Sequence, residues 1–232
     1  MSRTLRQRLR LGLLRLFARG TRRHIGATVC DAPPSPRILI VRPDHLGDLL
    51  FTTPALRALR ERYPASHLTA LIGPWGTPIL SDNPCVDEII PLAFPGFTRT
   101  ARSSLWGPYG LLYRWARRLR GRYDLALILR FDHWWGAWLA YGAGIPMRVG
   151  YDVPEVTPFL SHVVPYVPGR HQVIQNLRLL DWDVTDWCEP DIRSAGRRPV
   201  LEFPIAESAH AWARAHLRVG SAIAIHPGAG AP

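Results

Sequence analysis

The chain alternates between short apolar runs and longer stretches in which apolar residues recur at helical spacing. The clearest run covers residues 38–41 (ILIV), and polarity returns at Arg42. A continuous run of this length predicts a strand that is buried on both faces of a parallel sheet. Leu56, Leu59 and Tyr63 then recur at helical spacing, and Pro64 ends the segment. Residues 37–64 therefore predict a strand, a turn and a helix.

The rest of the chain repeats this alternation. The same criteria predict strands over residues 67–73, 86–92, 123–130 and 147–151, and helices near 104–121, 132–143, 171–182 and 203–220. The helix at 171–182 carries Val173, Ile174, Leu177 and Leu180 on one face. Alternation of this kind predicts an α/β fold, a Rossmann-like doubly wound parallel sheet. Residues 221–232 (SAIAIHPGAGAP) predict another strand with a glycine-bearing turn, which we interpret as the start of a second, truncated α/β domain.

The turn after the first strand carries one glycine, Gly47, and beside it the carboxylate of Asp48. Open α/β sheets bind ligands at the carboxyl ends of their strands, and Asp48 lies in that loop if the helix begins at Pro54 with Thr53 as its N-cap. The alternative is a helix that starts at Leu49 and is capped by Asp48. These local signals leave both possibilities open.

Composition limits the class of protein. With 232 residues and 47% hydrophobic content, the chain can bury a full core. Its three cysteines, Cys30, Cys85 and Cys188, are far apart and odd in number, which indicates neither a disulfide framework nor a zinc site and fits a reducing compartment.

The formal charge of +11 is concentrated at the N-terminus. Residues 1–36 hold eight arginines and one acid, Asp31, for 8 − 1 = +7, which leaves 11 − 7 = +4 for the rest. Apolar residues at near-helical spacing lie between these arginines, a pattern typical of a helix on an anionic membrane surface. The apolar runs are too short to span a bilayer. A disordered basic tail and an organelle transit peptide are the alternatives. The turn-rich stretch 31–36 (DAPPSP) predicts a linker.

The motifs bring the chain close to a known family. Residues 37–64 (RILIVRPDHLGDLLFTTPALRALRERYP), 86–92 (VDEIIPL), 129–152 (LRFDHWWGAWLAYGAGIPMRVGYD), 171–180 (HQVIQNLRLL) and 223–232 (IAIHPGAGAP) resemble glycosyltransferase family 9, the ADP-heptose:lipopolysaccharide heptosyltransferases. The resemblance implies a GT-B architecture of two Rossmann-like domains. It covers residues 37–232, as an acceptor-binding domain (37–220) and the beginning of a truncated donor domain (221–232), whereas the basic arm and linker (1–36) are not part of the family pattern.

The resemblance also assigns an activity. It implies an inverting glycosyltransferase that needs neither metal nor cofactor and moves heptose from ADP-heptose to a lipid-linked lipopolysaccharide core acceptor. The enzyme would work in the cytoplasm, peripheral at the inner membrane face, with residues 1–23 on the anionic surface. The 232 residues alone are expected to be inactive, because transfer needs both domains closed on the substrates.

Asp48 matches the family's catalytic aspartate, a general base that takes the proton of the attacking hydroxyl. In the same turn, Arg42, Asp44, His45 and Gly47 are candidates for the acceptor site. Arg130, Asp132 and His133 follow the predicted strand at 123–130 and are expected at the same sheet edge. The candidate donor-phosphate loop comprises His226, Gly228, Ala229 and Gly230, whose backbone N–H groups would bind the diphosphate.

Other functions remain as alternatives. The transferase could use another nucleotide sugar for a cell-surface glycan. A dinucleotide-dependent oxidoreductase would need G-x-G-x-x-G after the first strand, and the turn lacks it. A nucleic-acid binder could use the arm, yet the body carries no such motif, and we expect no nucleic-acid partner. The D-x-D at 181–183 imitates a metal motif but lies at the end of a predicted helix rather than after a strand.

Overall fold

The computed structural model describes residues 12, 24–25, 34–97, 106–180 and 199–217. Their strands form one sheet in the order β1-β7-β6-β5-β2-β3-β4. All of the neighbouring pairs run parallel. The strands are β1 (His24–Ile25), β2 (Arg37–Arg42), β3 (His67–Ile72), β4 (Glu88–Pro91), β5 (Leu125–Ile128), β6 (Met147–Tyr151) and β7 (His162–Val164).

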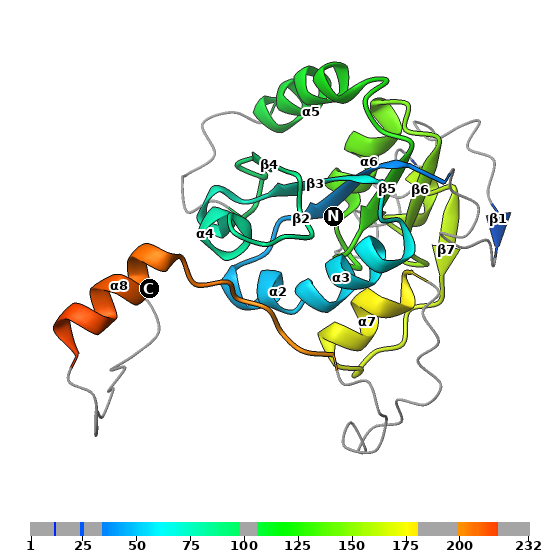
Figure 1. Ribbon diagram of the computed structural model, residues 1–232. Helices are drawn as coiled ribbons and strands as arrows, with labels where there is room; N and C mark the ends of the chain where they lie inside the picture. The colour runs from blue at the N-terminus through cyan, green and yellow to red at the C-terminus, as the bar shows by residue number, and fades with distance from the viewer. Residues whose placement is uncertain (1–11, 13–23, 26–33, 98–105, 181–198, 218–232) are drawn as a thin grey trace.

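Helices cover both faces of this sheet (Figure 1). The helices are α2 (Leu46–Leu50), α3 (Thr53–Arg62), α4 (Thr77–Leu80), α5 (Gly107–Leu119), α6 (Trp134–Gly142), α7 (Gln172–Arg178) and α8 (Glu207–His216), with short 3-10 turns η2 (Pro74–Gly76) and η3 (Thr157–Phe159). Figure 1 shows α5 and α6 on one face and α2, α3 and α7 on the other. The predicted doubly wound parallel sheet is therefore confirmed.

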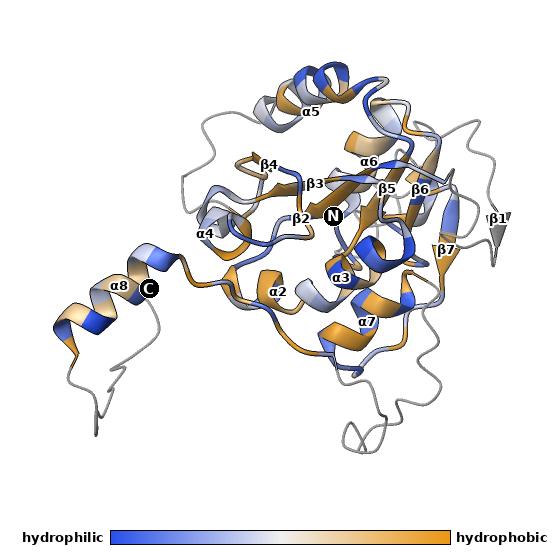
Figure 2. Cartoon of the chain, in the orientation of Figure 1, coloured by the Kyte–Doolittle hydropathy of each residue, from blue (hydrophilic) through white to orange (hydrophobic). Residues whose placement is uncertain are grey.

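The alternation of side chains along β2 explains the two layers. Leu39 and Val41 belong to the core under α5 and α6, whereas Ile38 and Ile40 belong to the core under α3 and α7. All four are at most 2% exposed. A strand that is buried on both faces reads as a continuous apolar run, which is why the pattern was visible in the sequence. The central strands are apolar along most of their length (Figure 2).

The start of α3 and the N-terminal extent of the sheet differ from the predictions. Helix α3 begins at Thr53, with Thr52 at the N-cap and Pro54 in the first turn, so the predicted N-cap is wrong by one residue. Strand β1 lies within the N-terminal segment predicted to be an arm and a linker, and it pairs with β7. The sheet therefore reaches into residues 1–36, while the rest of that segment up to residue 33 lies outside the described residues apart from residue 12.

The C-terminal part of the described chain packs little. Helix α8 lies within the range of the helix predicted near 203–220. None of its residues is buried. The segment before it is joined to α3, because the backbone N–H of Glu202 donates to the Thr53 hydroxyl at 2.9 Å and its carboxylate pairs with Arg57. The expected second domain at residues 221–232 lies outside the described residues. Within the described ranges, every helix is too short or too polar to cross a bilayer.

Candidate active site

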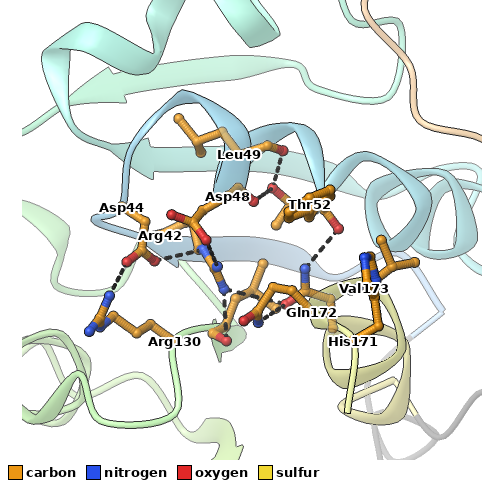
Figure 3. Close-up of polar contacts among 12 residues, drawn as sticks. Arg42, Asp44, Asp48, Leu49, Thr52, Arg130, His171, Gln172 and Val173 are labelled. Carbon is orange, nitrogen blue, oxygen red and sulfur yellow. Dashed lines mark hydrogen bonds and ion pairs between the residues drawn. The ribbon is translucent and has the colours of Figure 1, made fainter. Parts of the chain in front are cut away.

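The candidate residues gather where the order of the sheet reverses. From β2 the chain continues to β3 and β4 on one side, whereas β5, β6 and β7 extend on the other side. β2 and β5 are neighbours, so the segments that follow them diverge from the carboxyl edge of the sheet. Such a switch point is the usual ligand site of an open α/β sheet. Arg42, Asp44 and Asp48, from the end of β2 and the segment after it, meet Arg130, from the segment after β5, at this point (Figure 3).

Arg42 lies at the centre of the site. It is the last residue of β2 and only 2% exposed, so it lies in the buried strand and not in the turn, where it was predicted as an acceptor-site candidate. Its Nε pairs with Asp44 Oδ2 at 2.8 Å and its Nη2 with Asp48 Oδ1 at 3.4 Å. Its Nη1 donates to the carbonyl of Leu129 at 3.0 Å. Burial lowers the pKa of Arg42 from the usual arginine value, and the two carboxylates partly offset this effect.

The pairing continues from Asp44 to the segment after β5. The Asp44 carboxylate is 2% exposed and also binds Arg130 Nη1. Arg130 Nε donates to Asp132 Oδ1 at 2.5 Å. Burial opposes the charge of Arg130, but the hydrogen bonds to Asp132 and Asp44 outweigh it and raise the pKa of Arg130. Five side chains thus alternate in charge from Asp48 through Arg42, Asp44 and Arg130 to Asp132.

Asp48 is placed differently from both sequence interpretations. It lies within α2, in the first turn, and His45 occupies the N-cap position, so Asp48 is neither in a loop nor the cap of a longer helix. Its side chain is 42% exposed, in contrast to the buried Arg42 that holds it. The neighbouring Gly47 is exposed, and a Cβ built on it would meet no heavy atom within 4 Å. The Asp48 carboxylate is therefore accessible to a substrate hydroxyl from solvent.

His45 is exposed beside this site. Its ring lies 5.4 Å from the ring of Trp75 between centroids. Trp75 Nε1 donates to the backbone carbonyl of Asp44 at 2.8 Å. η2, which contains Trp75, thus fixes the backbone between Arg42 and Asp48, a contact that no local sequence signal indicated.

Helix α7 supplies a second support that the sequence did not reveal. Asn176, which is fully buried, accepts from Arg42 Nη1 at 3.4 Å and from Gln172 Nε2 at 3.3 Å. Its Nδ2 donates to the carbonyl of Phe51 at 2.8 Å, at the C-cap of α2. One amide therefore holds both the arginine and the helix that carries Asp48. The expected apolar face is confirmed for Val173, Ile174 and Leu177, which are buried, whereas α7 ends at Arg178, so the buried Leu180 lies beyond the helix predicted to reach 182.

His133 lies apart from the open site. It is 4% exposed, and its ring contacts those of Phe94 and Phe97 at 5.2 and 5.6 Å between centroids. Neither ring nitrogen has a hydrogen-bond partner among the described residues. Gly136 permits the approach of the ring, because a Cβ there would lie 2.4 Å from Nδ1. Burial, helped by Arg130, lowers the pKa of His133 to about 3.

This burial predicts a pH dependence of stability. The unfolded state binds a proton near the ordinary histidine pKa of about 6.5, whereas the folded state does so only near 3, so the free energy of unfolding falls as pH drops through that window. One histidine of this kind lowers the free energy of unfolding by up to ~1.4 kcal/mol per pH unit, and we expect His133→Phe to remove this contribution. Urea unfolding at several pH values between 7 and 4 measures it, with the exposed His210→Phe as control. An unchanged pH profile for His133→Phe would contradict the assignment.

The tryptophans of α6 contribute to the core. Trp135 is 2% exposed, and Trp134 and Trp138 pack against the same cluster. The predicted donor loop, His226, Gly228, Ala229 and Gly230, lies outside the described residues, as does the D-x-D at 181–183. Within the described ranges, no group of three or more His, Cys, Asp or Glu residues could hold a metal ion.

Comparisons with curated proteins find relatives of one kind. The chain is 30% identical to lipopolysaccharide heptosyltransferase 2 of Escherichia coli over 121 residues, which is 50% of this chain and 31% of the relative. It is 27% identical to lipooligosaccharide heptosyltransferase 2 of Haemophilus ducreyi over 157 residues, 67% of this chain and 42% of the relative. The chain thus spans less than half the length of these relatives. No family model matches the chain.

Two solved structures share the fold. The glycosyl transferase family 9 structure from Veillonella parvula is 23% identical, with a TM-score of 0.60 over 79% of this chain and 49% of that one. The ADP-heptose lipopolysaccharide heptosyltransferase II structure of Escherichia coli is 21% identical, with a TM-score of 0.57 over 80% and 51%. The described sheet and its helices therefore correspond to about half of each structure.

Proposed function

We propose a function on the premise that the chain is related to glycosyltransferase family 9, a resemblance that the curated relatives confirm. The protein transfers a sugar from a nucleotide donor to a glycan acceptor. The names of these relatives, which are lipopolysaccharide and lipooligosaccharide heptosyltransferases, favour heptose as the sugar and lipopolysaccharide as the acceptor. The donor is ADP-heptose, and the reaction inverts the anomeric centre without a metal ion.

The arrangement of Asp48 carries this proposal. It is a half-exposed carboxylate at the switch point of the sheet, held by a buried arginine and accessible from solvent. As the acceptor hydroxyl attacks the anomeric carbon, its proton passes to the Asp48 carboxylate and the new C–O bond forms. The bond from the anomeric carbon to the diphosphate breaks, and ADP leaves with the electron pair. Attack from the face opposite the leaving group inverts the configuration.

Arg42 acts here as a positioning residue. Its guanidinium is fixed by Asp44, the Leu129 carbonyl and Asn176, so only Nη2 points to the exposed carboxylate. A general base must lie within hydrogen-bond reach of the proton that it removes, and a fixed base satisfies this at lower entropic cost. Arg130 and Asp132, which continue the row of charges, and the exposed His45 of the same turn contact the acceptor. The buried His133 packs against Phe94 and Phe97 instead.

The donor diphosphate belongs to the glycine loop that contains His226, Gly228, Ala229 and Gly230. Backbone N–H groups of such a loop stabilise the leaving ADP. These residues lie outside the described ranges, so the proposal for them rests on the sequence motif alone.

The arginine-rich residues 1–23 place the protein on the cytoplasmic face of an anionic membrane. A deletion of 1–23 spares β1, and we expect it to abolish most binding to anionic vesicles at low salt while the sheet stays folded. Sedimentation with vesicles and circular dichroism measure the two effects. Equal sedimentation of the deleted and the whole chain would refute the role of these residues.

A transfer assay tests the function itself. The full-length protein is incubated with ADP-heptose and a heptose-deficient lipopolysaccharide core in the presence of a metal chelator. The expected result is ADP release, a product heavier by one heptose, and an inverted anomeric configuration by NMR. Transfer from a different nucleotide sugar, with none from ADP-heptose, would refute the donor and leave the glycosyltransferase class standing. Loss of transfer on chelation would refute the metal-independent mechanism.

A further inference from the structure

Helix α5 presents an exposed face with unusual side chains. Trp106, at its N-cap, is 79% exposed, and Tyr109 and Tyr113 are 45% and 61% exposed. These three recur at helical spacing, so they follow one outward stripe of the helix. The adjacent face, with Leu112, Ala116 and Leu119, is buried against the core, and Tyr109 at its border contacts the ring of Trp138 at 5.8 Å between centroids. Exposed aromatic residues in a row mark interaction surfaces more often than chance contacts with solvent.

Arginines continue this stripe toward the C-terminal end of α5. Arg114, Arg117, Arg118 and Arg120 are exposed. Arg117 lies over the ring of Tyr113 at 5.8 Å, and Arg118 over that of Trp115 at 4.8 Å. No acid occurs in the sequence between Glu88 and Asp124, a stretch of 35 residues with seven arginines. The exposed charged side chains of α5 and its C-cap are therefore all basic, which disfavours a second copy of the same face as its partner because like charges would repel.

We propose that α5 docks on an anionic membrane surface, in addition to the arginine-rich N-terminal segment. Tryptophan and tyrosine favour the boundary between headgroups and acyl chains, and arginines bind the anionic headgroups beside it. The apolar face of α5 already packs on the core of the protein, so only its aromatic and arginine side chains remain to contact lipid. The helix therefore lies on the membrane surface and does not cross the bilayer. The combination of aromatic and cationic residues fits a bilayer better than a protein groove.

The connectivity gives this docking a direction. β4 ends at the carboxyl edge of the sheet and β5 starts at the amino edge, so α5 runs back across the sheet with Trp106 and Tyr109 toward the carboxyl edge. Trp135 Nε1, just after residues 130–133, donates to the Pro108 carbonyl at 3.2 Å and ties the start of α5 to α6. The aromatic end thus lies on the same edge as Asp48. On the proposed function, this edge faces the membrane that holds a lipid-linked acceptor.

Vesicle binding by full-chain variants tests the proposal. The basic variant carries Arg114→Gln, Arg117→Gln and Arg118→Gln. Its control carries Arg62→Gln, Arg170→Gln and Arg214→Gln, three exposed arginines on other elements, so both variants lose the same net charge. The aromatic variant carries Trp106→Ser and Tyr113→Ser, and its control is Trp212→Ser on α8, where the tryptophan is 59% exposed. All of the replaced side chains are exposed, and thermal unfolding checks that each variant folds.

Partitioning is measured on phosphatidylcholine vesicles with and without phosphatidylglycerol, which contain no glycan acceptor. We expect the basic variant to bind anionic vesicles about tenfold or more weakly than its control, since each cationic residue near the surface contributes several-fold. The aromatic variant should also bind more weakly than Trp212→Ser. The partition coefficient is the product of the contributions of the separate membrane-binding segments. Binding by the N-terminal segment therefore does not hide a loss at α5.

Partition coefficients equal to those of the matched controls would overturn the proposal. A basic variant that keeps vesicle binding but loses binding to an RNA or DNA oligonucleotide would overturn it in favour of a nucleic-acid surface. Because the vesicles carry no acceptor and the readout is not transfer, failure of this proposal is distinguishable from failure of the proposed enzymatic function.

Discussion

Asp48→Asn is expected to lower the turnover of sugar transfer by about 10² or more in the full-length protein, the scale for loss of a general base. Asparagine keeps the size of the side chain and can still accept from Arg42 Nη2, but it cannot take up the proton of the acceptor hydroxyl. The fold should be unchanged, because the side chain is 42% exposed and only its 3.4 Å contact with Arg42 is altered. The initial rate of ADP release at saturating substrates measures the effect.

The matched control is Asp82→Asn, an exposed carboxylate outside the site, which should leave turnover unchanged. Donor binding by calorimetry should be equal in both variants, since Asp48 is assigned to the acceptor. A turnover of Asp48→Asn within a few-fold of the unmodified protein would exclude Asp48 as the base. A parallel loss of donor affinity would show instead that the substitution disturbs the whole site.

Arg42→Met should destabilise the fold by about 3–5 kcal/mol, the usual effect of removing one partner of a buried ion pair. Methionine fills much of the volume of the arginine stem, so the cost comes from the polar groups left behind. Asp44 keeps only Arg130 as an ion-pair partner, and the Leu129 carbonyl loses a donor. Urea unfolding of the whole chain gives the change in the free energy of unfolding.

The control is Arg37→Met, at the other end of the same strand. Arg37 also pairs with a carboxylate, that of Asp124, but its side chain is 48% exposed. Water replaces the lost partners of an exposed pair, so we expect a much smaller loss than for Arg42→Met. Equal losses for the two variants would mean that burial of Arg42 is not what makes it essential.

The larger elements could be predicted from the sequence because each carries its own periodic signal. The buried strands β2 and β5 read as apolar runs, and α3 and α7 show apolar residues at helical spacing. Short elements lack room for such a signal. β7 has only three residues, of which the first is His162, and α2 has five, so each holds barely more than one period of its pattern. They form because neighbouring strands and helices hold them in place.

Charged residues of the site could be predicted from the sequence, whereas the residue that holds them in place could not. Asp48, Asp44 and Arg130 were found because they follow buried strands, and parallel strands bring such positions to one edge. Asn176 gave no signal, since it lies 134 residues from Arg42 and amide residues are common in helices. The burial of Arg42 and His133 was equally hidden. A polar residue after an apolar run is usually solvated, and only the tertiary contacts decide otherwise.

The alternating row of charges described above also sets how a proton can move through the site. Asp48, Asp44 and Asp132 contribute three negative charges and Arg42 and Arg130 two positive ones, so the row carries a net charge of 3 − 2 = 1 negative unit. In the proposed reaction, capture of the acceptor proton brings the row to neutrality instead of adding charge to a partly dehydrated region. The proton arrives at one of the two ends of the row that water can reach, since the Asp48 side chain is 42% exposed. It can therefore pass from Asp48 to solvent without crossing the buried Arg42 and Asp44.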